Sequence, residues 1–206
     1  MNLFKKITAW VALTALLYSI VPAGVYAYDQ EEVDAANKLA GLNVIVDHSS
    51  NVSDYNLDST VLRQEVAAVA RWLAGLDKKT TCNGSFSDVS ATTPNDWACY
   101  SVEALLDNGL IAANATFEPE KNISKSEALG MMVKASDLWY AYDENSSMTW
   151  QEQLLNFAVS KGLVESFSDF NTPATRGWIF KTGANSFDAK SSDEADLLSD
   201  LLNDLL

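Results

Sequence analysis

Histidine, cysteine and positive charge are scarce in this chain. Its 206 residues include one histidine, His48, and two cysteines, which excludes a multi-histidine metal site. Lys and Arg number 14 against 28 Asp and Glu, so the net charge is −14 and the pI is near 4.3. That balance argues against nucleic-acid binding and against adsorption to anionic lipid, because both need a basic surface. A hydrophobic content of 48% is instead typical of a globular chain with a core.

The first 27 residues predict an export signal. A basic pair at 5–6 precedes an uncharged stretch, 7–20, which is followed by Pro22 and by Val25-Tyr26-Ala27. Small or short residues at the third and first positions before the cleavage point fit a signal peptidase. The alternative is an uncleaved anchor, since the uncharged residues continue through Tyr28 and could just span a bilayer. Cleavage would leave 28 acidic and 12 basic residues, a charge of −16. We expect an exported protein with no membrane span after signal cleavage.

Export would place the two cysteines in an oxidising compartment. Cys82 and Cys99 enclose a turn-rich segment, and in an oxidising compartment a disulfide is the first interpretation. A bridge that closes a loop of this size would contribute about 3 kcal/mol to stability in the chain-entropy view. A buried thiol pair or a metal pair are the alternatives, although the chain has no second Cys or His pair to complete a zinc site.

One helix–loop–helix pattern occurs three times. Each copy has an apolar-periodic helix that ends in Gly-Leu, then a polar loop, then a second helix opened by a basic residue. The first helices are expected over 33–42, 97–113 and 150–161, and the second helices open at 61–65, 123–127 and 174–178. The opening basic residues Arg63, Lys125 and Arg176 lie 62 and 51 residues apart. Because one such helix pair cannot bury an apolar face alone, the three are expected to stack on one another.

The same pattern predicts the buried faces and the boundaries. Residues expected in the core are Val66, Val69, Ala70 and Leu73, then Val102, Leu105 and Leu106, then Leu129, Met132 and Val133. The three units are predicted at 28–76, 77–142 and 143–187. The remaining residues, 188–206, are acidic and carry a stripe of leucines, which favours a docked or partner-seeking helix over a catalytic element.

The motifs of the three units, taken in order, match the pattern of one protein family. The second unit reads Phe86-Ser87-Asp88-Val89, Trp97-Ala98, Gly109-Leu110-Ile111, Phe117-Glu118-Pro119 and Ile123-Ser124-Lys125-Ser126-Glu127. The first has Gly41-Leu42-Asn43-Val44, Tyr55-Asn56-Leu57 and Val61-Leu62-Arg63-Gln64-Glu65, and the third has Phe167-Ser168-Asp169-Phe170 and Ala174-Thr175-Arg176-Gly177-Trp178. This pattern resembles the S-layer homology (SLH) family over nearly all of 29–187.

The resemblance implies a fold and a site. The fold would be mainly α, with three repeats in a pseudo-threefold arrangement around a central helical bundle and grooves between the repeats. In the family such grooves bind cell-wall polysaccharide, which often carries an acidic group. By position in the motif, the ligand-binding cations would be Arg63, Lys125 and Arg176.

The opening cations also call for a physical explanation. A cation is mildly unfavourable at the positive end of a helix dipole, yet a helix N-terminus with a cation beside it suits an anion. Anion-binding grooves are therefore favoured, with salt bridges to the abundant carboxylates as the alternative. Trp178 beside Arg176 could stack on a sugar, whereas the other tryptophans are expected in the core. Weaker candidate cations lie further along the second helices: Arg71, Lys134 and Lys181.

Helix capping explains part of the motif without any ligand. Ser124 and Glu127 have the spacing of a capping box. In the third unit Thr175 can cap the helix, although Trp178 replaces the glutamate. In the first unit Leu62 stands at the cap position, so Glu65 cannot complete the same box.

Two other classes of function are weaker. Asp54, Asn56, Asp58 and Glu65 have the spacing of a calcium loop, but Ser59 replaces the turn glycine. Catalysis has little support, because so many acids make carboxylate pairs inevitable and His48 has no nucleophile motif near it. We predict a non-catalytic surface protein without a cofactor that attaches to the cell envelope through wall polysaccharide, with other surface-layer proteins as further candidate partners. A calcium-dependent interaction module resembling a dockerin is the alternative.

Overall fold

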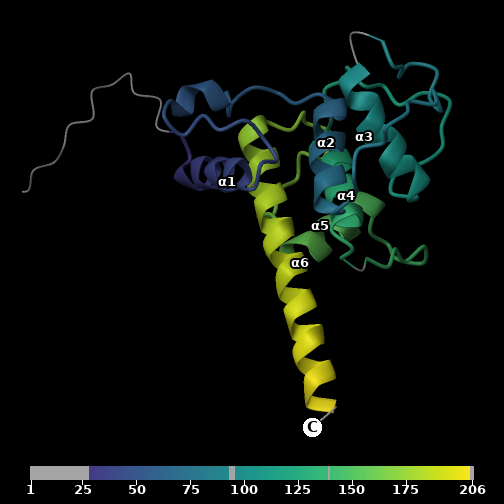
Figure 1. Ribbon diagram of the computed structural model, residues 1–206. Coiled ribbons are helices and arrows are strands. Elements are labelled where there is room, and N and C mark those ends of the chain that lie inside the picture. Colours follow the sequence, from purple (N-terminus) through teal and green to yellow (C-terminus); the bar gives the residue numbers. More distant parts are fainter. Residues whose placement is uncertain (1–27, 93–95, 139, 205–206) are drawn as a thin grey trace, which may run out of the picture.

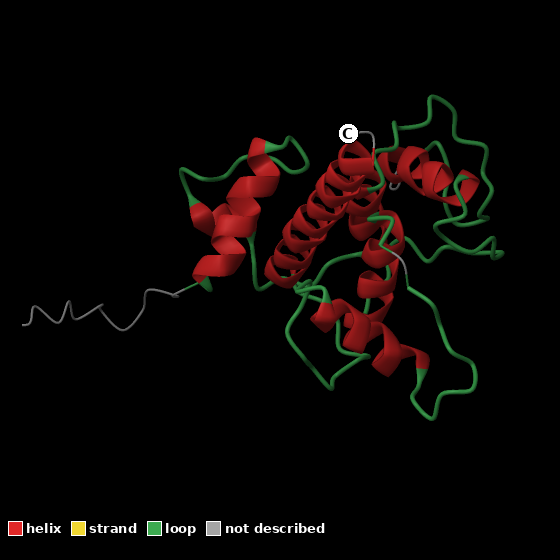
Figure 2. Ribbon diagram, turned by 90° about the horizontal axis from the view of Figure 1, so that it is seen from below, coloured by secondary structure: helices red, strands yellow, loops and turns green. Residues whose placement is uncertain are grey.

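The computed structural model describes residues 28–92, 96–138 and 140–204 (Figure 1). The expected signal segment lies outside the described residues. The elements are α1 (Gln30–Gly41), the 3-10 turn η1 (Val52–Tyr55), α2 (Arg63–Leu73), α3 (Asp96–Asp107), α4 (Lys125–Ala135), α5 (Trp150–Ser160) and α6 (Arg176–Asp204). No strand is formed by the described residues (Figure 2), and none of their helices is long and apolar enough to cross a membrane. The prediction of a mainly α fold is confirmed.

The first helix of each unit forms where the periodicity predicts it. In the third unit, Thr149 and Glu152 make a capping box, with the Glu152 N–H donating to the Thr149 hydroxyl at 3.3 Å and the Thr149 N–H donating to the Glu152 carboxylate at 2.7 Å. The helix expected over 97–113 ends earlier, at Asp107. Gly109 takes φ +69° there, and the Leu110 N–H donates back to the Leu105 carbonyl at 2.9 Å. A glycine in this left-handed conformation stops a helix, and this overrides the apolar periodicity that continues past it.

The second helices form the centre of the molecule. Helices α2, α4 and α6 contact one another, and each also carries the first helix of another unit on its outer side. Helix α3 packs on α2, α5 packs on α4, and α1 packs on α6, so the first and last helices lie together (Figure 1). All the residues expected in the core are buried except Leu106, which is half-buried. Burial is thus decided by the period of the apolar residues.

A ring of backbone hydrogen bonds joins the three segments that open the central helices. The Val61 N–H donates to the Ala174 carbonyl at 3.1 Å, the Ala174 N–H to the Ile123 carbonyl at 2.9 Å, and the Ile123 N–H to the Val61 carbonyl at 3.1 Å. Each segment therefore donates one bond and accepts one. The side chains of all three residues are buried, so these bonds are shielded from water and fix the three helix openings beside one another.

The third central helix is longer than the other two. Helix α6 runs from Arg176 to Asp204 without a break, so the acidic stretch expected as a separate element continues the helix of the third unit. Its first half packs against the other central helices and its second half extends away from them (Figure 1). All side chains of residues 191–199 are exposed.

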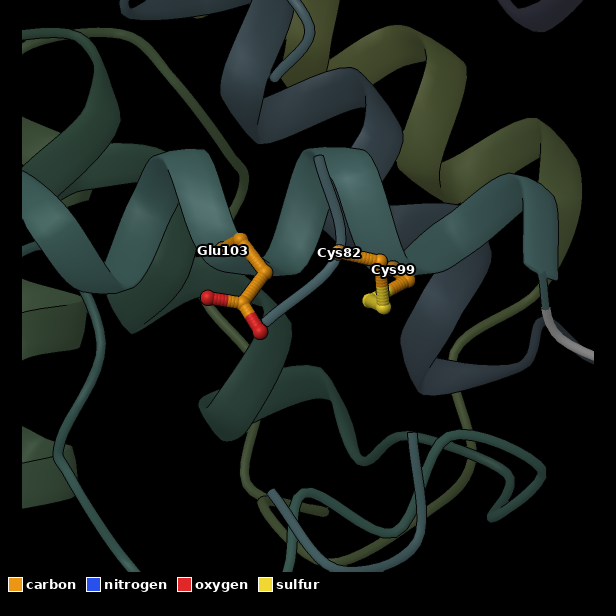
Figure 3. Close-up of side chains that lie close together, drawn as sticks. All are labelled: Cys82, Cys99 and Glu103. Carbon is orange, nitrogen blue, oxygen red and sulfur yellow. A yellow bond between two sulfur atoms is a disulfide. The ribbon is translucent and has the colours of Figure 1, made fainter. Parts of the chain in front are cut away.

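The two cysteines are joined, as predicted. The Cys82–Cys99 disulfide, with Cα atoms 5.7 Å apart, ties the linker between the first two units to α3 (Figure 3). The buried carboxylate of Glu103, one turn further along α3, accepts hydrogen bonds from the Ser85 N–H at 3.0 Å and the Ser85 hydroxyl at 2.8 Å. A covalent bond and a satisfied buried carboxylate together hold this linker against the helix.

Candidate functional site

The openings of the second helices differ in their caps. At α4 the capping box predicted from the sequence is present, since the Glu127 N–H donates to the Ser124 hydroxyl and the Ser124 N–H donates to the Glu127 carboxylate at 3.0 Å. At α6 the Thr175 hydroxyl accepts from the Trp178 N–H at 3.3 Å. At α2 half of the box survives, because Glu65 accepts from the Leu62 N–H at 2.8 Å while the leucine side chain offers no acceptor.

Each predicted cation makes an ion pair with a carboxylate from another unit. Arg63 lies 3.1 Å from Glu127, and Arg176 lies 2.8 Å from Glu65. The third unit has Trp178 where the others have glutamate, and Lys125 pairs instead with Asp169 at 3.0 Å. The salt bridges that the sequence left open as an alternative are therefore formed. They connect neighbouring units around the ring and leave 20–29% of each cationic side chain exposed.

The ion pairs and caps shift the acidities of their carboxylates. The hydrogen bond from Lys125 is the largest effect on Asp169 and lowers its pKa. Burial raises the pKa of Glu127, but hydrogen bonds from the Ser124 N–H and hydroxyl and from Lys121 outweigh it, so the pKa is lowered overall. Both carboxylates are thus held in the charged form that pairs with the cations.

Three surface cavities each contain one of the three cations. The cavity at Arg63 has a volume of about 270 Å³, the cavity at Arg176 about 290 Å³, and the cavity at Lys125 about 250 Å³. A fourth hollow, between α1 and α6, contains none of them.

Each of the three cavities lies between units. The Arg176 cavity is lined by the first and third units, and the other two cavities are lined by all three. The chain that follows the first helix of the next unit lines the other wall: Leu110 and Ile111 opposite Arg63, Leu163 and Val164 opposite Lys125, and Ile45 and Val46 opposite Arg176. The predicted cations therefore lie in three separate grooves between units.

Trp178 lies in the Lys125 cavity and not beside Arg176. Its half-buried ring packs edge-on against Phe167, with ring centroids 5.9 Å apart, and both rings line that cavity. The reason is the helical geometry, since two residues along α6 turn the side chain to a different face of the helix. Trp178 was expected to act beside Arg176 because the two residues are close in the sequence. In the structure it lines the cavity of Lys125 instead.

The structure adds aromatic residues that sequence reasoning expected in the core. Trp97 and Trp150 are each 43% exposed. Trp150 lines the Arg63 cavity together with Tyr140 and Lys134, so this cavity has an aromatic side as well as two cations. Trp150 is the first residue of its helix, and that position, rather than its periodicity, signalled its exposure.

The weaker candidate cations differ in whether they line one of the three cavities. Lys134 lines the Arg63 cavity and Lys181 lines the Lys125 cavity, whereas Arg71 lines none of the three and its guanidinium donates to the Leu76 carbonyl. The residues with calcium-loop spacing are not gathered around one point. The carboxylate of Glu65 is engaged by the Leu62 N–H and by Arg176, and the one group of possible metal ligands within the described ranges is Cys82, Cys99 and Glu103.

The fold and the cavities define a small helical protein whose surface carries cation-bearing grooves between structural units. Two comparisons with known proteins found similar sequences. Residues 85–129, which lie within the second unit, match the family model of the S-layer homology domain. The chain is also 21% identical, over 98% of its length, to the protein named "Middle cell wall protein" from Brevibacillus brevis (strain 47 / JCM 6285 / NBRC 100599). The chain spans 20% of the length of that relative.

Proposed function

We propose that this protein attaches to the cell envelope by binding cell-wall polysaccharide in the grooves between its units. The observation that carries the proposal is the distribution of the cations: Arg63, Lys125 and Arg176 each lie in a separate groove of 250–290 Å³. Such grooves are large enough for sugar residues, and each has a cation that is held in place but still partly exposed.

The SLH match and the cell-wall relative support a role at the cell surface for this chain. The export signal expected in the first 27 residues would bring the protein there. We infer that the first and third units are further SLH-like repeats and that the arrangement is pseudo-threefold. The closed ring of hydrogen bonds among Val61, Ala174 and Ile123 supports this inference, because equivalent segments make equivalent bonds.

The ion pairs help to explain how an acidic protein can bind an acidic polymer. The carboxylates of Glu65, Glu127 and Asp169 fix the position of each cation, so little side-chain entropy is lost when a ligand binds. Repulsion from the rest of the surface is screened beyond about 8 Å at physiological salt. A contact inside a groove therefore outweighs the overall charge.

Trp178 and Trp150 extend the proposal to uncharged sugar faces. Both rings line cavities that hold a cation, Trp178 the Lys125 cavity and Trp150 the Arg63 cavity. Aromatic rings bury the apolar face of a sugar while the cation and nearby polar groups bind its substituents. The proposed function is binding, with no catalytic step.

Co-sedimentation of residues 28–206 with purified cell walls tests the proposal. The triple variant Arg63→Ala, Lys125→Ala, Arg176→Ala is expected to lose wall binding while it stays folded by circular dichroism. The matched control is Lys38→Ala, Lys79→Ala, Lys161→Ala, which removes the same charge and also breaks three ion pairs, but outside the three grooves.

The outcomes separate the alternatives. Binding that survives in the triple variant would overturn the assignment of the grooves. Equal loss in the control would mean that general charge, not the grooves, governs binding. Binding that a chelator abolishes in the native chain would favour the calcium-dependent module.

A further inference from the structure

Glu32 of α1 occupies an unusual place at the start of α6. Its carboxylate lies so close to Gly177 that a Cβ added to that glycine would overlap it. The corresponding residues of the other two units, Gln64 and Ser126, do carry side chains. The absence of a side chain at position 177 therefore allows α1 to bring a carboxylate to this point, and at this point alone among the three helix openings.

The same carboxylate lines the Lys125 cavity and changes its charge. Asp29, Glu32 and Glu165 line this cavity, and the cations that line it are Lys125 and Lys181. Both cations are already paired: Lys125 with Asp169 at 3.0 Å, and Lys181 with Glu31 and, at 3.6 Å, with Glu165. Glu32 takes part in none of the ion pairs found among the described residues. The cavity therefore has an excess of negative charge.

The Arg63 cavity has the opposite balance. Arg63 and Lys134 line it against a single carboxylate, Glu127. The Arg176 cavity lies between the two, with Asp54 and His48 beside the arginine. The three grooves therefore share a motif cation but differ in the groups that surround it.

We propose that Glu32 makes the Lys125 groove select an uncharged sugar and reject an acid-bearing one, so that acidic substituents are bound elsewhere on the protein. This inference rests on the proposed function, because it assigns a ligand class to one of the three proposed glycan grooves. An acidic sugar placed here would face three lining carboxylates, Asp29, Glu32 and Glu165, which outnumber the two lining cations.

An uncharged sugar finds suitable partners in the same groove. Carboxylates accept hydrogen bonds from sugar hydroxyls, and the half-buried ring of Trp178 offers an apolar face. The acidity of Glu32 agrees with this environment: burial is the main cause that raises its pKa, and Asp29 and Asp58 add to the shift while Lys181 opposes it.

The indole resonance of Trp178 in a proton–nitrogen NMR spectrum, assigned with Trp178→Phe, tests the inference directly. Methyl glucoside and methyl glucuronide serve as the uncharged and acidic probes, because they differ in one carboxylate. The native protein is expected to show a saturable shift of this resonance with the glucoside and a several-fold weaker response to the glucuronide. Glu32→Gln should remove that difference. Asp34→Asn is the matched control, because it neutralises an exposed carboxylate of the same helix that neither lines this cavity nor pairs with Lys125 or Lys181, and it should preserve the difference.

Two results would overturn the inference. One is an equal response of the native Trp178 resonance to both probes, and the other is no response to either probe in any variant. Both are distinguishable from failure of the proposed function, because wall binding through the Arg63 and Arg176 grooves is measured separately by co-sedimentation and does not depend on Trp178.

Discussion

The two halves of α6 belong to one helix but to different environments. In the first half Ile179 is 1% exposed and Phe180 is 5% exposed, and the helix packs against α1, α2 and α4. In the second half Leu197 is 62% exposed and Leu198 is 59% exposed. Apolar side chains are thus present in both halves, but Ile179 and Phe180 are covered by other helices whereas Leu197 and Leu198 are exposed.

The difference teaches that a helix can be continuous without being uniformly stabilised by packing. The two halves meet where the helix leaves the body. There Asp188 pairs with Lys38, Lys190 donates to the Leu73 carbonyl at 3.2 Å, and Asp193 pairs with Lys161 at 3.1 Å. Exposed ion pairs of this kind contribute about 0–1 kcal/mol each. Most of the stability of the fold therefore lies in the first half and in the helices around it.

The largest effect is expected from the buried face of the first half. Ile179→Ala should lower the free energy of unfolding by about 2–5 kcal/mol, because it removes buried methyl groups and leaves a cavity between the central helices. Urea denaturation followed by circular dichroism measures the change. A loss below about 1 kcal/mol would mean that this half is not the packed one.

A smaller loss is expected from Gly177→Ala. The added Cβ would overlap the Glu32 carboxylate, which is the flexible end of its side chain. The glutamate must therefore turn out of the groove, at a cost near the lower end of the range of about 1–3 kcal/mol for overpacking. Gly183→Ala on the same helix is the control. Its Cβ would lie 3.4 Å from the nearest atom of Val69, an ordinary contact, and alanine favours the helix by up to about 1 kcal/mol. In thermal unfolding, the melting temperature of Gly177→Ala should therefore fall below that of the native chain, and that of Gly183→Ala should rise above it.

Removal of the far end of α6 should have little effect on stability. A chain that ends at Lys190 loses the Lys161–Asp193 pair but keeps the contact of Lys190 with α2, so we expect a loss of at most about 1 kcal/mol. Comparison of urea midpoints with the full chain measures it. A loss as large as that of Ile179→Ala would show that the exposed half packs on the body after all.

The smallest expected effect is a pH dependence of stability, caused by Glu32 of α1 where it lies against the start of α6. The pKa of Glu32 is raised above its ordinary value of 4.5 by burial, helped by Asp29 and Asp58, so the folded state binds this proton more tightly than the unfolded state. The protonated form is therefore favoured by folding below the raised pKa, and this contribution is lost as the pH rises through it.

Glu32→Gln has no such proton to lose. We expect the melting temperature of this variant to rise relative to the native chain between pH 4 and pH 7. Other carboxylates are common to both chains and largely cancel in the difference. A difference that stays constant over this range, or that falls, would contradict the predicted shift.

Sequence reasoning predicted the elements well where the signal is local. The apolar period predicted the buried face of α2 and α4, and the Ser124–Glu127 spacing predicted a capping box. Two cysteines in a chain expected to be exported predicted the disulfide. Prediction was weaker where a single residue stops a pattern, as Gly109 does at the end of α3. The second half of α6 was expected as a separate element because its composition changes, but composition does not end a helix.

The sequence by itself determined the helices, their caps and the three positions of the opening cations, because these depend on residues close together along the chain. The tertiary structure alone decided which carboxylate pairs with each cation, that Trp178 shares a groove with Lys125, and that Glu32 of the first helix lies against Gly177 of the last. The physical reason is the packing of α1 on α6, which joins residues about 145 positions apart. No local period or motif encodes which helix another helix will pack against.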